Sequence, residues 1–581
     1  MQKHEVAMMQ WVVAVVSLIL GLLLSFTIAG YPPIPFPDGI VHGALAAFGN
    51  PLMLWGLIPG AALAAFLCWA CHEYLFSGFE GYRYEKYIRG TKMENRHQLN
   101  GRIHQYNNKY RRRAKPPHDY PRPPVSVAGI EFPTDLETQG IILVGSPGTG
   151  KSQAIQGLVA AAFDREDRMV VVDPNGTLCS RFYLPGDHII NPYDERCIGW
   201  SLFNEVAEGF DFERLARSAI PPQKSGDQED WAGFARDVLA DTMKKMQMNG
   251  LRDVDVLTDL LVRRDRRLLQ AYLRDTDSAG FFAKDADRAT ASIIFTLNKY
   301  IRPLRRIGDG DFSIREWMSN EDGGNIWITW REDQRVALEP TIPIWLDLVY
   351  AMILSEAPTF SRRLWVFKDE LASIGRLNSF QGAMQKGRKH GLCDVGGIQG
   401  FVQLDQMLGV EGAKDVLDCY RSMLVLGGAN AEATERASVM LGKHEVERHP
   451  LPVQGGWRTN QRERRHESEQ IVIASEISTL PDLQGYLKYG KDWPVTKVKM
   501  KVRKFPERVE PFIERSRMEE RRLVDERGVE YEIVDDEPED DVAPADAEAG
   551  DGTEADTVGF VHAGGTAATN TPEPPAPGRG A

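Results

Sequence analysis

The sequence predicts an α/β protein, with a doubly wound, mostly parallel sheet and an all-α segment inserted between its strands. Short, continuously apolar runs recur between residues 140 and 428, as strands buried on both faces require, and helical patterns lie between them. Two long charge-free stretches precede this part and an acidic segment follows it. They add a predicted two-helix transmembrane anchor and a predicted disordered tail.

The composition limits the class of protein. The 581 residues are 43% hydrophobic and 26% charged, which is too polar for a polytopic transporter. The net charge of −13 comes from the C-terminal end, because residues 529–581 carry 14 acidic residues and one basic residue. The remaining part is neutral, so the acidic total does not exclude a nucleic-acid partner. The six cysteines show no zinc-site spacing and predict no disulfide framework, which favours a reducing compartment.

Residues 1–76 predict a transmembrane anchor. Helices at about 11–29 and 52–71 are apolar and long enough to cross a hydrocarbon layer of ~30 Å. A signal peptide is the alternative for the first, but its apolar part is longer than usual and a second span follows directly. Basic residues outnumber acidic ones by twelve to three in 83–122. The positive-inside rule therefore places the N- and C-termini in the cytoplasm.

The basic juxtamembrane segment, residues 77–125, has two interpretations. It could bind anionic lipid, at about 1 kcal/mol per basic residue, or it could form a collar that contacts nucleic-acid phosphates with the help of interleaved tyrosines. Its proximity to the predicted spans favours the lipid interpretation.

A complete Walker A motif follows an apolar run and precedes a helical pattern. The chemistry explains the residues: glycines let backbone N–H groups converge on phosphate oxygens, the lysine reaches the β- and γ-phosphates, and the serine hydroxyl holds Mg²⁺. The order of strand, loop and helix predicts a P-loop NTPase that binds ATP and Mg²⁺. The predicted nucleotide-binding residues of the loop are Gly145, Ser146, Pro147, Gly148, Thr149, Gly150, Lys151 and Ser152.

The run RLWVFKDE at 363–370 is the predicted Walker B strand. It would deliver Asp369 to the Mg²⁺ ion, which Ser152 also holds, and Glu370 would polarise the attacking water. The alternative is an ordinary acidic pair at a strand end. Lys368 departs from the motif, since an apolar residue is expected at that position.

Two further residues are candidates for the same reaction. Gln399, at the end of the predicted strand CDVGGIQ, could contact the γ-phosphate. Arg388, in the basic run KGRKHGL, could supply a charge to the ATP of a neighbouring subunit. The predicted catalytic residues are therefore Lys151, Glu370 and Arg388.

The apolar periodicity is helical from residue 211 to residue 307, which predicts an all-α domain. The nucleotide-binding domain would then comprise residues 126–210 and 308–515. Seven arginines of the insert could contact DNA phosphates, or they could form a solvated face balanced by neighbouring aspartates. They are Arg263, Arg264, Arg266, Arg267, Arg302, Arg305 and Arg306.

Residues 530–581 form a predicted disordered acidic tail. The segment is rich in Asp, Glu, Ala, Gly and Pro and has too few large apolar residues to build a core. It would either keep the protein soluble or bind a basic partner.

Together these motifs resemble the TrwB/TraD family, the coupling proteins of conjugative type IV secretion systems. The resemblance covers roughly residues 10–510 and rests on GSPGTGKS, VVVDPNG, HIINPYDERCIGWSLFNE, GDGDFSIREW, ITWRED, LWVFKDELASI and KGRKHGL. It implies a RecA-like motor domain and an all-α domain, assembled as a homo-hexamer around a DNA channel. It also implies that Arg388 is the arginine finger and that Trp231 lies in the helical segment facing the channel.

The predicted function is an ATP-dependent DNA translocase of the bacterial inner membrane that couples the relaxosome to a type IV secretion channel during conjugation. The expected partners are single-stranded or double-stranded DNA, a relaxase with its relaxosome proteins, inner-membrane secretion components and anionic lipid. The alternatives are a secretion ATPase that moves protein subunits, an FtsK-like chromosomal DNA pump, and a membrane scaffold with a vestigial nucleotide site. FtsK-like pumps usually carry four spans and a long linker, whereas two spans are predicted here.

Overall fold

A computed structural model provides the structure of the chain. The predicted spans at 11–29 and 52–71 lie outside the described residues except for 15–16, and the acidic segment 530–581 lies wholly outside them. No helix in the described part is by itself long and apolar enough to cross a membrane, although the bent pair Glu332–Leu338 and Ile342–Ser355 passes by length and composition. The described residues are 15–16, 85–114, 122–223, 226–263, 266–282, 287–307, 310–428, 430–448 and 465–515.

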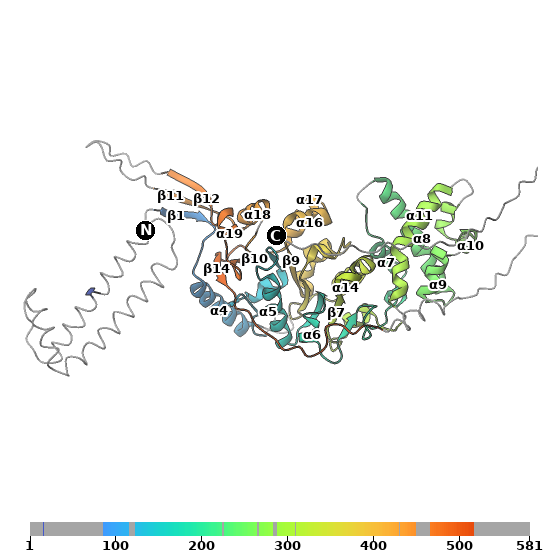
Figure 1. Cartoon of the computed structure of the whole chain (residues 1–581), viewed down its shortest axis with the longest axis horizontal. Coiled ribbons are helices and arrows are strands. Elements are labelled where there is room, and N and C mark those ends of the chain that lie inside the picture. Colours follow the sequence, from blue (N-terminus) through green and yellow to red (C-terminus); the bar gives the residue numbers. More distant parts are fainter. Residues whose placement is uncertain are drawn as a thin grey trace, which may run out of the picture. The chain divides into compact units, whose positions relative to one another are not determined.

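A nine-stranded sheet in the order β14-β13-β10-β4-β9-β8-β5-β7-β6 organises the α/β part (Figure 1). The seven strands from β10 to β6 are parallel, and β13 and β14 add an antiparallel edge. The predicted apolar runs are confirmed as strands, whereas the antiparallel edge was not predicted. The strands are β4 (Ile141–Val144), β5 (Arg168–Pro174), β6 (His188–Ile190), β7 (Ile326–Trp330), β8 (Leu364–Lys368), β9 (Leu392–Ile398), β10 (Ser422–Leu426), β13 (Gln484–Lys488) and β14 (Thr496–Lys499).

Helices pack on the sheet and close its core. The central strands are buried along their whole length, as their continuous apolar runs require. Helix α5 packs into the same apolar cluster as β4, and α14 is buried at nearly every position. The helices of this part are α5 (Lys151–Asp164), α6 (Cys179–Phe182), α12 (Ile314–Ser319), α13 (Arg335–Leu338), α14 (Ile342–Ser355), α15 (Phe380–Lys386), α16 (Phe401–Leu408), α17 (Val410–Cys419), α18 (Ala431–Leu441) and α19 (Ala474–Ser478).

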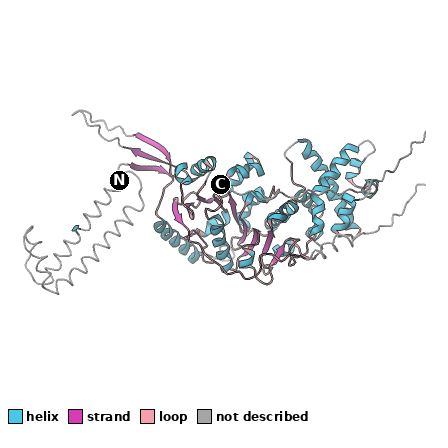
Figure 2. Cartoon of the chain, viewed as in Figure 1, coloured by secondary structure: helices cyan, strands magenta, loops and turns pink. Residues whose placement is uncertain are grey.

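Between β6 and β7 the chain forms the helical segment, which we define as residues 211–306. Figure 2 shows only helices and loops among its described residues. Its long helix α8 buries Ala235, Leu239, Met243 and Met246, which recur at helical spacing on one face. The elements are α7 (Asp211–Ala219), α8 (Gly226–Met248), α9 (Val254–Thr258), a π-helical turn (Asp259–Arg263), α10 (Arg266–Tyr272), a 3₁₀ turn (Asp277–Phe282), α11 (Asp287–Ile301) and a second 3₁₀ turn (Arg302–Arg306).

Part of the basic segment 77–125 is folded, which the sequence analysis did not predict. Strand β1 (Glu85–Gly90) pairs with β11 (Lys443–Arg448), which pairs in turn with β12 (Arg465–Gln470). Helix α4 (Arg96–Arg113) buries Leu99 and Ile103 in the main core, and a short hairpin of β2 (Ser126–Val127) and β3 (Ile130–Glu131) follows. Only two apolar residues, four positions apart, indicate the buried face of α4 in a segment with many charged residues.

Candidate nucleotide site

The Walker A loop is held between the carboxyl ends of β9 and β10, the two strands that flank β4. Gly145 N–H donates to the carbonyl of Ile398 at the end of β9 (3.1 Å), and Ser146 N–H donates to that of Gly427 after β10 (3.0 Å). Gly150, with φ +107°, adopts a left-handed conformation directly before α5. A Cβ atom there would also lie 2.7 Å from Leu483 Cδ2. The glycine therefore serves both the turn and the close packing of the loop.

The two functional side chains of the loop meet the predicted Walker B carboxylates. Ser152 Oγ donates a hydrogen bond to Asp369 Oδ2 (2.7 Å), and Lys151 Nζ lies 3.2 Å from Glu370 Oε2. Gln399 Nε2 also donates to Glu370 Oε2 (2.8 Å). The structure thus brings these five residues together, and we call them the nucleotide-site cluster. It contains every predicted site residue outside the glycine-rich loop except Arg388.

A glycine in β9 makes this meeting possible, and sequence reasoning missed it. Strand β9 lies between β4 and β8, so the lysine must reach across it. A Cβ atom on Gly397 would lie 2.2 Å from the Asp369 carbonyl oxygen and 3.1 Å from Lys151 Cδ. Consecutive glycines inside a predicted strand are the signal that could have indicated it, because such residues mark a close approach of other groups.

The carboxylates are placed for a hard cation. Asp369 Oδ1 and Glu370 Oε1 are buried and have no hydrogen-bond partner among the described residues. Burial raises the pKa of Asp369, while the hydrogen bond from Ser152 and the charge of Lys151 oppose the rise. A buried polar atom without a partner costs about 1–3 kcal/mol, which a ligand would offset. The donors fit Mg²⁺, because a carboxylate and a hydroxyl oxygen can complete its shell together with phosphates and water.

No group of three or more His, Cys, Asp or Glu in the described ranges could hold a metal ion by itself. Mg²⁺ usually binds through one or two carboxylates together with the phosphates of its substrate. A further carboxyl, Asp173 at the end of β5, accepts hydrogen bonds from the backbone N–H groups of Leu178 and Cys179. Burial raises its pKa to about 7, and the nearby charge of Asp369 adds to the rise.

Arg388 lies far from the Walker A loop of its own chain. It belongs to a 3₁₀ turn, Gly387–His390, that precedes β9, whereas the loop is bonded to the last residue of β9. The seven residues of β9 correspond to about 20 Å. Arg388 lies near Asp135, where its charge opposes the rise in that carboxyl's pKa caused by burial.

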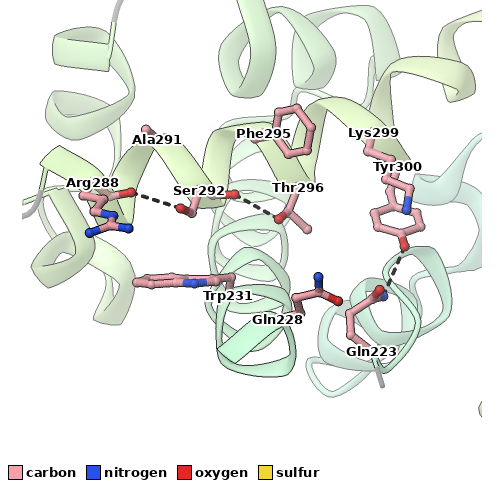
Figure 3. Close-up of a pocket in the computed structure, with 10 residues that line it drawn as sticks. All are labelled: Gln223, Gln228, Trp231, Arg288, Ala291, Ser292, Phe295, Thr296, Lys299 and Tyr300. Atoms are coloured by element: carbon pink, nitrogen blue, oxygen red, sulfur yellow. Dashed lines mark hydrogen bonds between the residues drawn. The ribbon is translucent and has the colours of Figure 1, made fainter. Parts of the chain in front are cut away.

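The helical segment has a pocket of about 480 Å³ between α8 and α11. Figure 3 shows the ring of Trp231, from α8, lying across from Arg288 and Ser292 of α11. Phe295 has 74% of its surface exposed. The lining includes two cationic side chains and no carboxylate: Gln223, Gln228, Trp231, Arg288, Ala291, Ser292, Phe295, Thr296, Lys299 and Tyr300.

The seven candidate DNA-binding arginines fall into different groups. Arg305 donates to Asp255 Oδ1 (2.8 Å) and is mostly buried, which indicates a structural ion pair. Arg302 and Arg306 are exposed. The side chains of Arg263 and Arg264 lie outside the described residues, whereas Arg266 is half-buried and Arg267 is exposed.

Comparison with known proteins agrees with this fold. A family model, type IV secretion-system coupling protein DNA-binding domain, matches residues 124–501. Coupling protein TraD of Escherichia coli (strain K12) is 29% identical over an alignment of 410 residues that covers 67% of this chain and 56% of TraD. The match thus spans little more than half of the length of TraD.

Solved structures of the conjugative coupling protein TrwB are also similar. The unbound form of TrwBdeltaN70 is 36% identical, with a TM-score of 0.69 over 76% of this chain and 99% of that chain. TrwB in complex with the ATP analogue ADPNP is 36% identical, with a TM-score of 0.68 over 76% and 100%. TrwB in complex with ADP and Mg²⁺ has the same identity and TM-score over 75% and 99%.

These likenesses and the mixed sheet support a RecA-like NTPase fold. The family model alone matches well over half of the sequence. The predicted resemblance to TrwB and TraD is therefore confirmed, and the chain belongs to the family of type IV secretion-system coupling proteins.

Proposed function

We propose that the chain is an ATP-dependent DNA translocase that couples the relaxosome to a type IV secretion channel during conjugation. The observation that supports this most is the nucleotide-site cluster, which joins Lys151 and Ser152 to carboxylates more than 200 residues away. The TrwB relatives bound to ADPNP or to ADP and Mg²⁺ support ATP and Mg²⁺ as the ligands.

Each residue of the cluster has a proposed role in hydrolysis. The ammonium of Lys151 leaves Glu370 and binds the β- and γ-phosphates. Ser152 and Asp369 would hold Mg²⁺, which would neutralise phosphate charge. Glu370, freed from the lysine, orients the attacking water, and Gln399 keeps its carboxylate in place through the 2.8 Å hydrogen bond.

Arg388 completes the site of a neighbouring subunit in this proposal, because it lies at the end of the sheet opposite its own loop. We therefore propose a homo-hexamer in which each subunit supplies Arg388 to the next. The proposed division is a RecA-like domain (126–210 and 308–515) and an all-α domain (211–307). It also includes the two-span inner-membrane anchor (1–76) with both termini in the cytoplasm, the lipid-binding basic segment (77–125) and an interaction tail (530–581).

The pocket between α8 and α11 is the proposed contact for single-stranded DNA. A base can stack on an aromatic ring such as that of Trp231 or Phe295, while Arg288 and Lys299 neutralise phosphates. Fluorescence anisotropy with labelled oligonucleotides should show weaker binding for Phe295→Ala, by about tenfold if one stack of 1–3 kcal/mol is lost. Phe360→Ala, at an exposed phenylalanine outside the helical segment, is the matched control and should bind like the wild type.

Hydrolysis with and without DNA tests the proposed function. The full-length chain, purified in detergent, should hydrolyse ATP faster when single-stranded DNA is added, and Lys151→Ala should show no turnover in either condition. A rate of ATP hydrolysis that no DNA changes would favour a secretion ATPase that moves protein subunits. Nucleotide binding without turnover would favour a scaffold.

A further inference from the structure

Lys368, the last residue of β8, directly precedes Asp369 and has no exposed surface. Its ammonium donates to Asp394 Oδ2 on the adjacent strand β9 and to Tyr350 Oη on α14 (2.5 Å). The position where an apolar residue was expected is thus one half of a buried ion pair. Its partner is equally unusual, since Asp394 lies inside a strand whose seven residues are all buried.

The carboxylate of Asp394 is fully satisfied. Tyr350 Oη donates to Oδ2 (2.6 Å), and Tyr420 Oη, beyond the end of α17, donates to Oδ1. Burial and the charge of Asp394 raise the pKa of both tyrosines well above the ordinary value, so both stay protonated donors. We call Tyr350, Lys368, Asp394 and Tyr420 the Lys368 cluster.

Stability alone does not account for this pair. Removing two charges from water costs several kcal/mol per ion, and well-packed apolar residues in their place are often equally stable or more stable. Directional bonds, however, fix geometry. Parallel pairing sets Lys368 opposite Gly396 and Val366 opposite Asp394, so the ion pair runs diagonally between the two strands. Any slip of β8 along β9 would break it.

Strands β8 and β9 also carry residues of the nucleotide-site cluster. Asp369 and Glu370 follow β8 directly, and Gln399 follows β9. A Cβ atom on Gly396 would point at Tyr420 Oη, and one on the next residue, Gly397, at Lys151. The Lys368 cluster therefore lies on the face of β9 opposite to the Walker A lysine, directly behind the nucleotide-site cluster.

Helix α14 connects the Lys368 cluster to the helical segment. One turn before Tyr350, Asp347 accepts a hydrogen bond from Ser218 Oγ of α7. Its other oxygen accepts from the backbone N–H of Ser379. Helix α15 starts directly after Ser379 and leads into the turn that carries Arg388. Helix α14 thus contacts the Walker B strand, the first helix of the helical segment and the start of α15, which leads to Arg388.

We propose that Lys368 and Asp394 are positioning residues that hold β8 and β9 in the register required for hydrolysis and that, through Tyr350 on α14, couple the nucleotide site to the helical segment. This inference rests on the proposed function. DNA at the helical segment would change both the binding of nucleotide and the rate of hydrolysis by shifting α14. Because coupling between two binding events is reciprocal, nucleotide would also change the binding of DNA through α7.

The first test removes the ion pair without leaving a buried charge. The double variant Lys368→Met/Asp394→Val leaves the buried hydroxyls of Tyr350 and Tyr420 without their acceptor, so it should fold with a thermal midpoint below that of the wild type but above that of Lys368→Met alone. Its KM for ATP should stay within about twofold, whereas kcat should fall about tenfold, because binding needs the loop but turnover needs Glu370 in register. A kcat equal to that of the wild type in the folded double variant would overturn the positioning role.

The second test uses two matched hydroxyl deletions. Tyr350→Phe and Tyr420→Phe each remove one donor from Asp394, but only Tyr350 belongs to α14. Stimulation of ATP hydrolysis by single-stranded DNA should fall at least threefold in Tyr350→Phe and remain in Tyr420→Phe. Equal losses in both variants would overturn the coupling and leave only a general effect on stability.

A third measurement does not depend on DNA. Binding of ADP and Mg²⁺ should slow amide hydrogen exchange in residues 211–219 of the full-length wild type and of Tyr420→Phe, but not of Tyr350→Phe. If DNA did not change the rate of hydrolysis by the wild type, the proposed function would be contradicted. The difference in hydrogen exchange between Tyr420→Phe and Tyr350→Phe would still support the coupling. The same exchange change in Tyr350→Phe would overturn the coupling even if DNA stimulates the wild type.

Discussion

Two polar clusters lie back to back on β8 and β9, and they differ in how completely their hydrogen bonds are formed. In the nucleotide-site cluster, Asp369 and Glu370 each keep one buried oxygen without a partner among the described residues. In the Lys368 cluster, both oxygens of Asp394 accept hydrogen bonds. Unpaired buried groups cost free energy unless a ligand binds them. The nucleotide-site cluster is therefore suited to binding a ligand, and the Lys368 cluster is suited to fixing the positions of β8 and β9.

The difference also separates activity from stability. A change in the nucleotide-site cluster should remove a proposed contact to substrate and leave the fold intact. Replacing only Lys368 or only Asp394 leaves an unpaired buried charge, at a cost of about 3–5 kcal/mol. Substitutions in the nucleotide-site cluster should therefore reduce activity more than stability, and substitutions in the Lys368 cluster should reduce stability more than activity.

The largest expected effect compares the two lysines. Lys151→Ala should reduce ATP hydrolysis to background and lower the thermal midpoint less than Lys368→Met does, because the ion pair that it breaks is less buried than the pair of Lys368 with Asp394. Lys368→Met alone should lower the thermal midpoint sharply, because Asp394 would remain charged and buried. Measuring kcat and thermal melting on both variants checks the contrast, and a stable Lys368→Met protein would break it.

Arg388 should show the next largest effect, through a neighbouring subunit. Arg388→Ala should keep ATP affinity and lose about 10³-fold or more in turnover, as expected of a residue that meets charge developing on the γ-phosphoryl oxygens. Mixing Arg388→Ala with Lys151→Ala protein should restore some activity, since some interfaces then join two intact residues. No recovery in complexes shown by native mass spectrometry to be mixed would contradict action between subunits.

Asp369→Asn should act on the metal requirement. An amide is a poorer ligand than a carboxylate for Mg²⁺, so the Mg²⁺ concentration giving half-maximal hydrolysis should rise at least about tenfold. Titrating Mg²⁺ at saturating ATP measures this. An unchanged requirement would mean that another carboxylate, such as Asp173, holds the ion.

The smallest expected effect concerns pH. Burial raises the pKa of Asp347 above its ordinary value, so folding favours the protonated carboxyl. This contribution to stability is fully present below the ordinary pKa and is lost as pH rises through the folded pKa. Relative to Asp347→Asn, the wild type should lose thermal stability by about 1–3 °C as pH rises from 4 to 7. A difference that does not change with pH would contradict the shift.

The sequence predicts the nucleotide site more completely than its surroundings. The Walker A loop, Asp369, Glu370 and Gln399 follow from local patterns, because each directly follows a recognisable strand. Lys368 and Asp394 are each a charged residue in a buried, otherwise largely apolar strand. Only the pairing of β8 with β9 shows that the two side chains form an ion pair with each other. The contact of α14 with α7 joins residues far apart in the chain, so no local pattern could predict it.

The folded part of the basic segment was missed for a similar reason. Its charges dominate the composition, whereas only Leu99 and Ile103 carry the burial of α4. Strand β1 pairs with β11, which lies more than 350 residues away in the chain. Patterns within a segment cannot indicate such a partner.

Glu370→Gln tests the central claim most directly, because it changes one oxygen of the nucleotide-site cluster and nothing in the Lys368 cluster. Calorimetric titration should give an ATP affinity within about threefold of the wild type, while turnover by the same protein falls by about 10²-fold or more, as loss of a catalytic base predicts. A Glu370→Gln protein that hydrolyses ATP at the wild-type rate would contradict the account, since the catalytic carboxylate would then lie elsewhere.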